Sequence, residues 1–225
     1  LGELLRLQPK LLNQTNFVST YLTKLHPNPD IDWRHNPQAY TAYLDRLSKF
    51  VDQLAPVHNS LKAHVLYHRL VFDRSRGVYN KQRFMQYIKL PRNVSYINPE
   101  FLKRDLNRKY AANLGANYQP TTLLPVVGND EPLVRSYLHQ FFVEETTYEP
   151  YEPYISDVYL KENFAETKIV NGLGDAEKWY SMLPPAKYQA LKERIDLDFA
   201  ATNKLLFAPG EAVSLELDVK NVEKL

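Results

Sequence analysis

Apolar residues recur at intervals of three and four along most of the first 195 positions, which is the period of an amphipathic α-helix. The clearest run begins after Asn36, a favoured N-cap residue, with Pro37 at the first helical position, and it is broken by Pro56. Its apolar positions are Tyr40, Tyr43, Leu44, Leu47, Val51 and Leu54. A second long run follows at once over residues 57–73 and stops near Gly77. Two helices joined so tightly predict an antiparallel helical hairpin.

The same period, punctuated by proline, glycine and asparagine, predicts shorter helices on both sides of this hairpin. They are expected over residues 16–25, 81–89, 99–105, 131–142 and 154–170, then after Asp175, and from Pro184 to near Ile195. The predicted N-cap residues are Asn80, Asn98, Asp130 and Asp175. Residues 107–129 are expected to be irregular. We therefore predict a mainly α, multi-helix domain over residues 1–195.

Residues 213–220 switch to a period of two, which is typical of a β-strand with one buried face and one exposed face. The apolar positions Val213, Leu215, Leu217 and Val219 alternate with Ser214, Glu216, Asp218 and Lys220. A strand is expected at Ile195, Leu197 and Phe199, with Asp196 and Asp198 on its polar face. Another is expected over residues 202–208, joined to residues 213–220 by a turn at Pro209-Gly210. Because an isolated hairpin is marginally stable in water, we expect residues 196–225 to begin a β-sandwich and the chain to be a piece of a larger protein.

Residues 202–213 resemble the start of the β-sandwich domains that are repeated in alpha-macroglobulins. The matching positions are Thr202, Lys204, Phe207, Pro209, Gly210, Glu211 and Val213, whereas Asn203 replaces the usual Asp and Phe207 the usual Tyr. The resemblance implies a truncated macroglobulin-like domain over residues 196–225 of a large multidomain protein. It also implies an exported location, that is periplasmic, cell-surface or secreted. Proteins of that family trap proteases or serve as structural and interaction modules.

Cysteine is absent from the sequence, which removes disulfides, thiolate metal sites and cysteine nucleophiles. Its absence also removes the reactive thioester of macroglobulins, whose motif requires a Cys followed by Gly-Glu-Gln. No apolar run reaches the roughly 18 residues of a membrane-spanning helix, so no membrane span is expected. No phosphate-binding loop or serine nucleophile elbow is present either, and we predict neither a cofactor nor a catalytic residue.

Charge is unevenly distributed, although the net charge is only +2. Residues 62–109 contain 12 Lys and Arg against 3 Asp and Glu, whereas residues 130–225 contain 18 acidic against 10 basic residues. These parts are interpreted first as two faces of one domain, either solvated or attracting each other. The functional alternative is an anion-binding corner in the basic region, formed by Arg74, Arg76, Arg83, Lys89 and Arg92.

Aromatic residues lie between these bases, which raises a further alternative for the 62–109 region. Tyr79, Phe84, Tyr87 and Tyr96 could stack the bases of single-stranded nucleic acid. Amphipathic helices with tyrosine-rich seams show the same interleaving, so the pattern does not separate the two interpretations.

His64 and His68 are the best metal-ligand candidates, because residues four apart on a helix share a face. Val65 stands where zinc proteases have a Glu after the first His, and no third ligand is identifiable. Both histidines also fall on the apolar stripe of their helix, which favours core residues with hydrogen-bonded ring nitrogens. A metal-dependent hydrolase built on this pair is an alternative hypothesis, and no metal site is assigned.

Together these patterns predict a non-enzymatic interaction or scaffolding module of a large exported, macroglobulin-like protein. The expected partners are other domains of the same chain or another protein, and nucleic acid is not expected among them. The two alternatives are the hydrolase built on His64 and His68, and single-stranded nucleic-acid binding through residues 62–109.

Overall fold

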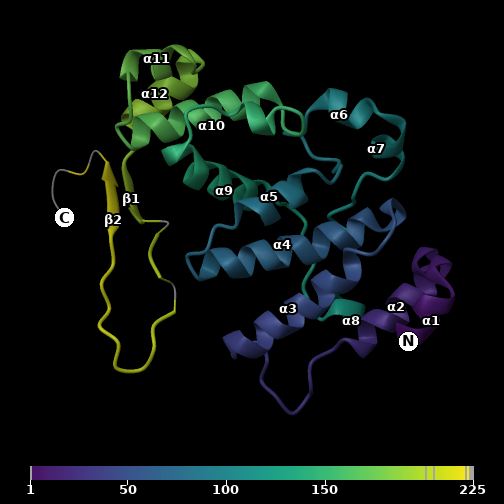
Figure 1. The fold of residues 1–225 in the computed structure, drawn as a ribbon. Helices are drawn as coiled ribbons and strands as arrows, with labels where there is room; N and C mark the ends of the chain where they lie inside the picture. The colour runs from purple at the N-terminus through teal and green to yellow at the C-terminus, as the bar shows by residue number, and fades with distance from the viewer. Residues whose placement is uncertain (1, 201, 205, 221, 223–225) are drawn as a thin grey trace. The chain divides into compact units, whose positions relative to one another are not determined.

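The computed structural model describes residues 2–200, 202–204, 206–220 and 222, and its ordered elements are mainly helical (Figure 1). The α-helices are α1 (Gly2–Leu7), α2 (Thr15–Lys24), α3 (Pro37–Val51), α4 (Asn59–Ser75), α5 (Lys81–Ile88), α6 (Pro99–Lys103), α7 (Asp105–Lys109), α8 (Gln119–Thr122), α9 (Glu131–Glu144), α10 (Asp157–Val170), α11 (Ala176–Ser181) and α12 (Pro185–Glu193). Short 3-10 helices are η1 (Pro9–Asn13), η2 (Pro56–His58) and η3 (Glu149–Tyr151). The strands are β1 (Asp196–Phe199) and β2 (Leu217–Lys220). The mainly α prediction is confirmed.

Local start signals act as predicted at α3, α6 and α11. The side chains of Asn36, Asn98 and Asp175 accept hydrogen bonds from the amides of Ala39, Glu100 and Glu177 at 3.0, 2.9 and 3.0 Å. Each bond satisfies an amide that has no partner within the first helical turn. Proline follows at the first position of α3 and of α6, where its missing N–H is harmless.

The described residues divide into two compact units by their contacts. The first unit contains residues up to Arg69 together with Met85–Asp130, and the second contains Leu70–Phe84 together with the residues from Glu131. Both α4 and α5 therefore contribute residues to each unit.

The core of the first unit is built from α2, α3 and the first part of α4. The hydroxyl of Tyr43 donates a 2.6 Å hydrogen bond to the carbonyl of Thr122 at the end of α8, and the ring of Trp33 packs edge-on against Tyr43. Arg69 in α4 forms a 2.6 Å ion pair with Asp45 in α3, which links the two helices. The buried apolar residues include Val18, Leu22, Leu44, Leu47, Phe50, Val51, Leu61 and Val65.

The core of the second unit is an aromatic seam between α9 and α10, which pack along each other (Figure 1). Phe142 of α9 meets the ring of Phe164 of α10 edge-on at 5.0 Å. Tyr137 stacks on Phe84 at 5.2 Å, and its hydroxyl donates a 2.9 Å hydrogen bond to the carbonyl of Leu70. The seam buries large rings and still satisfies the polar tip of Tyr137.

Strands β1 and β2 form a two-stranded antiparallel sheet. Leu197 lies opposite Val219 and Phe199 lies opposite Leu217, so the four apolar side chains share one face. They are between 42% and 58% exposed. No further strand is present among the described residues, so they do not form a β-sandwich.

The connection between the two strands is held by hydrogen bonds of a side chain rather than by main-chain pairing. Asn203 accepts a 2.8 Å hydrogen bond from the amide of Glu216 and donates one of 2.6 Å to its carbonyl. The predicted turn is present: Glu211 N donates to Ala208 O at 3.0 Å, and Gly210 has a φ of 80°.

The strand expected around Leu197 and Phe199 is present as β1 (Asp196–Phe199). The described residues between 202 and 208 contain no strand, contrary to prediction, and the last strand is limited to Leu217–Lys220. The bonds of Asn203 take the place of main-chain pairing near the strand predicted over residues 202–208. Residues 201, 205, 221 and 223–225 of this predicted region lie outside the described residues.

Candidate functional site

Arg92, one of the five predicted anion-binding residues, is completely buried in the first unit. Its Nε atom lies 3.1 Å from Oδ2 of Asp130, and neither side chain has any exposed surface. The guanidinium also donates to the carbonyl of Tyr87 and, at 3.2 Å, to that of Leu90. It lies 4.3 Å from the centroid of the Tyr87 ring. Arg92 is thus paired inside the protein, although its Nε atom makes no hydrogen bond.

Two tyrosines complete this buried charge cluster. The hydroxyl of Tyr87 donates a 2.6 Å hydrogen bond to Asp130, and the hydroxyl of Tyr96 lies 3.4 Å from the Arg92 guanidinium. Burial raises the pKa of Tyr87 and of Tyr96 well above the usual range, so both phenols stay neutral. Burial alone would lower the pKa of Arg92, but Tyr96, Tyr87 and Asp130 outweigh it, and the pKa is raised.

Asp130 was predicted to cap the helix that follows it, and this prediction is wrong. The residue does precede α9, but its carboxylate is directed at Arg92 and Tyr87. A buried guanidinium needs an anionic partner more than the exposed first turn of a helix needs a cap.

The other four predicted basic residues are divided between the units. Arg74, Arg76 and Arg83 belong to the second unit, whereas Lys89 belongs to the first. Arg83 is ion-paired with Asp73, and Arg74 donates a 3.0 Å hydrogen bond to Ser136 Oγ. Arg76 is exposed and lies 5.7 Å from the ring centroid of Phe72, while Lys89 is also exposed. Within the second unit the structure brings Arg74 and Arg83 toward protein partners rather than toward an open anion site.

His64 and His68 share a face of α4 as predicted, with ring centroids 4.8 Å apart. His64 Nε2 and Thr122 Oγ1 are hydrogen-bonded at 3.0 Å, and His68 Nε2 donates to Pro125 O at 2.8 Å. Burial, and then the neighbouring His68, lowers the pKa of His64 to about 3, so the imidazole is neutral at ordinary pH. Burial also lowers the pKa of His68.

These histidines have the environment of core residues. Across the part of the chain that the structure describes, no group of three or more His, Asp or Glu residues is placed to hold a metal ion.

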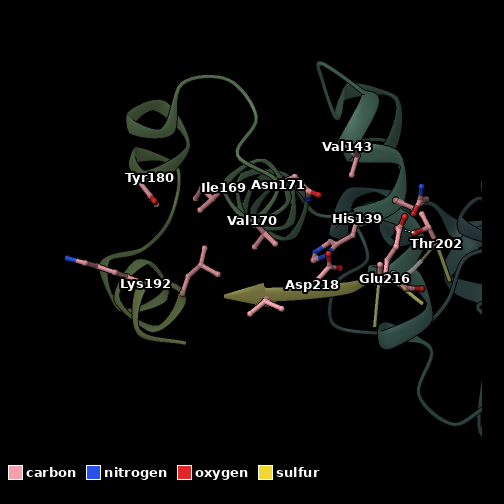
Figure 2. Close-up of a pocket in the computed structure, with 15 residues that line it drawn as sticks. His139, Val143, Ile169, Val170, Asn171, Tyr180, Lys192, Thr202, Glu216 and Asp218 are labelled. Atoms are coloured by element: carbon pink, nitrogen blue, oxygen red, sulfur yellow. Dashed lines mark hydrogen bonds between the residues drawn. The ribbon is translucent and has the colours of Figure 1, made fainter. Parts of the chain in front are cut away.

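A hollow of about 780 Å³ lies within the second unit, between the β-hairpin and helices α9 to α12 (Figure 2). Its apolar lining comes from Val143, Ile169, Val170, Leu191 and Val219. Its polar lining includes His139, Asn171, Tyr180, Lys192, Glu216 and Asp218. Glu216 and Asp218 line the hairpin side, and His139 lines the helix side (Figure 2).

His139 is a buried polar group of this hollow. Its Nε2 is 3.1 Å from Oδ1 of Asn163, and burial lowers its pKa. A neutral imidazole beside carboxylates and apolar groups can contact polar or apolar ligands. These side chains do not form a recognisable catalytic arrangement. The sequence did not predict this hollow, because its walls come from residues up to 83 positions apart, Ser136 to Val219. Only the alternation of residues 213–220 signalled that one strand face would meet something else.

Comparisons with known proteins identify relatives of this chain. The family model described as actin-binding protein F N-terminal domain matches residues 1–195. Actin-binding protein F of Dictyostelium discoideum is 28% identical over 212 residues, which cover 93% of this chain and 9% of the relative. The chain thus spans less than a tenth of that relative's length. No solved structure matches the chain.

These findings overturn the resemblance to alpha-macroglobulins. The family covers the whole helical part and carries no macroglobulin feature, so the macroglobulin-like module and its exported, periplasmic, cell-surface or secreted location were wrong predictions. The motif misled because its Pro209, Gly210 and Glu211 form a turn that unrelated β-hairpins also need. The comparisons support neither the metal-dependent hydrolase nor nucleic-acid binding.

Within the described residues, no helix combines the length and the apolar character that crossing a membrane requires.

Proposed function

The chain belongs to the family of actin-binding protein F N-terminal domains, and we propose that it is an interaction module that binds actin. The family match over residues 1–195 carries this proposal, because it covers the whole helical part of the chain. The name of the Dictyostelium relative supports actin as the partner. A cytoskeletal location follows from that partner.

Co-sedimentation with actin filaments tests the proposal directly. The purified 225-residue chain is expected to enter the pellet with filaments, in a saturable way, and to remain in the supernatant without them. Binding to monomeric actin is measured in parallel by the change in polarisation of labelled actin. Absence of binding in both assays at low salt would remove the proposed function.

Of the five basic residues named from the sequence, two are kept in this proposal as contributors to actin binding. Arg76 in the second unit and Lys89 in the first are exposed, and each is proposed to attract an acidic partner at long range. Arg74, Arg83 and Arg92 are proposed to act mainly within the fold, since each has a protein partner.

We also propose that residues 1–195 are a helical domain and that residues 196–225 begin a β-sandwich. The bounds of the family match support the boundary. The exposed apolar face of Leu197, Phe199, Leu217 and Val219 supports a sheet that continues, because large exposed apolar faces mark interfaces. Hydrogen exchange tests this: amides of Asp196–Phe199 and Leu217–Lys220 should exchange more slowly in an extended chain that carries further strands than in the 225-residue chain, and equal rates would contradict it.

A further inference from the structure

Residues 93–111 form a loop of the first unit whose two ends meet at one point. Arg92 and Ala112 form a parallel β-bridge, in which the amide of Ala112 donates a 2.7 Å hydrogen bond to the carbonyl of Pro91. Helices α6 and α7 lie side by side between these two ends (Figure 1). Compact loops with closed ends are frequently functional, because a rigid base can present a variable tip.

The base of this loop is fixed by the buried charge cluster. Arg92 stands at the start of the loop and is held by Asp130, while Tyr96 and Ile97 are buried just inside it. A buried ion pair contributes little net stability compared with apolar packing, so its value here lies in fixing the position of the base.

The tip of the loop is helical but takes no part in the core. Helix α7 has no buried residue, and Leu106 at its centre is 70% exposed. The side chain of Asn107 donates a 2.7 Å hydrogen bond to the carbonyl of Phe101, which is buried and anchors α7 to α6. Helix α7 is therefore an ordered helical turn on the surface that buries no side chain of its own.

The tip is also basic. Residues 103–109 contain four cations and one carboxylate, and the cations are Lys103, Arg104, Arg108 and Lys109. Lys103 and Arg108 pair with Glu100 and Asp105, but these four side chains are between 69% and 92% exposed. Such exposed pairs are weak, so an acidic partner can compete for both cations.

We propose that α7 and the end of α6 form the surface through which this domain contacts actin. This inference rests on the proposed actin-binding function. Actin is an acidic protein, so its charge complements the four cations, and the exposed Leu106 side chain would supply an apolar contact beside them. Arg92 acts as a positioning residue for this surface.

Two substitutions in the 225-residue chain test the proposal by filament co-sedimentation. The charge-reversal variant R104E/R108E is expected to weaken binding by about tenfold or more and to reduce its salt dependence. The variant Leu106→Ser is expected to weaken binding by about tenfold with an unchanged salt dependence, because it removes only apolar contact. Both should keep the thermal midpoint of the wild type, because α7 buries nothing.

A matched control separates local contact from general charge attraction. The variant K24E/K49E makes the same change in net charge at exposed positions of α2 and α3. It is expected to bind within about twofold of the wild type. Equal losses in R104E/R108E and K24E/K49E, or wild-type binding by both α7 variants, would overturn the proposal while actin binding stands. A wild-type chain that binds no actin would instead overturn the proposed function, and this surface with it.

Discussion

Arg92 is a cation without exposed surface. The cost of replacing it depends on the buried carboxylate of Asp130, which would be left without its partner. In the variant Arg92→Met the Asp130 carboxylate keeps its burial and loses its ion pair. We expect the free energy of unfolding to fall by about 3–5 kcal/mol, because an uncompensated buried charge is strongly destabilising. Urea denaturation followed by circular dichroism measures the loss.

The double variant Arg92→Met with Asp130→Leu is the control for this prediction. It removes both charges and should recover a large part of the lost stability, since apolar replacements of buried ion pairs are often neutral. A loss of less than about 1 kcal/mol in the single variant would show that water reaches the carboxylate.

His64 links stability to pH because its pKa is about 3 in the folded chain and near 6.5 in the unfolded chain. Between these values the unfolded chain binds a proton that the folded chain does not. The free energy of unfolding is therefore full above about pH 6.5 and falls as the pH falls, by up to about 1.4 kcal/mol per pH unit from this group. Burial of His68 acts in the same direction.

Replacing His64 isolates its share of this slope. The variant His64→Gln should show a flatter dependence of unfolding free energy on pH between about 6.5 and 5, measured by urea denaturation at each pH. The variant His35→Gln makes the same substitution at a side chain that is 84% exposed and serves as the surface control. Parallel curves for His64→Gln and the wild type would mean that other groups set the acid sensitivity.

At the scale of elements, the hairpin depends on one amide side chain. Asn203 bonds both the amide and the carbonyl of Glu216, and that carbonyl also accepts a 3.0 Å hydrogen bond from the amide of Ala200. The variant Asn203→Ala should lower the local stability of the hairpin by about 1–2 kcal/mol, because two bonds are lost. Hydrogen exchange at Ala200 and Glu216 should accelerate, while α9 is unchanged.

The variant Asn203→Asp is the graded control, since it keeps the acceptor for the Glu216 amide and loses the donor to its carbonyl. It should fall between the wild type and Asn203→Ala. Exchange that is the same in all three proteins would show that the bonds of Asn203 do not hold the hairpin together.

Elements whose signals are local could be predicted from the sequence. Asn36, Asn98 and Asp175 bond amides two or three residues ahead, so the chain near each residue contains the whole interaction. Asp130 failed as a predicted cap because its partner Arg92 lies 38 positions away, and no local pattern reports that pairing. The pairing of the strands was missed for the same reason, since Phe199 pairs with Leu217 across a long connection and residues 202–208 were expected in its place.

At the scale of the whole molecule, less of the candidate site than of the fold could be predicted from the sequence. The basic composition of residues 62–109 is real, but sequence spacing could not tell that Arg92 is buried and Arg83 paired. Family membership was also out of reach, because the helical part carries no short motif with a chemical reason of its own. The 12-residue turn pattern gave a false family, since turn geometry constrains those residues in any hairpin.

Two boundaries compete for the C-terminal part of the molecule. The family match ends at residue 195, whereas the contacts assign the hairpin to the second unit with α9 to α12. A hollow of about 780 Å³ lies between the hairpin and these helices, so the two are not in close contact there. We therefore expect a chain of residues 1–195 to fold, with a thermal midpoint within about 4 °C of the 225-residue chain, as a change below about 1 kcal/mol allows. Its actin binding should be unchanged, because α7 is retained.

A truncated chain that loses cooperative unfolding in calorimetry would show that residues 196–220 belong to the helical domain itself.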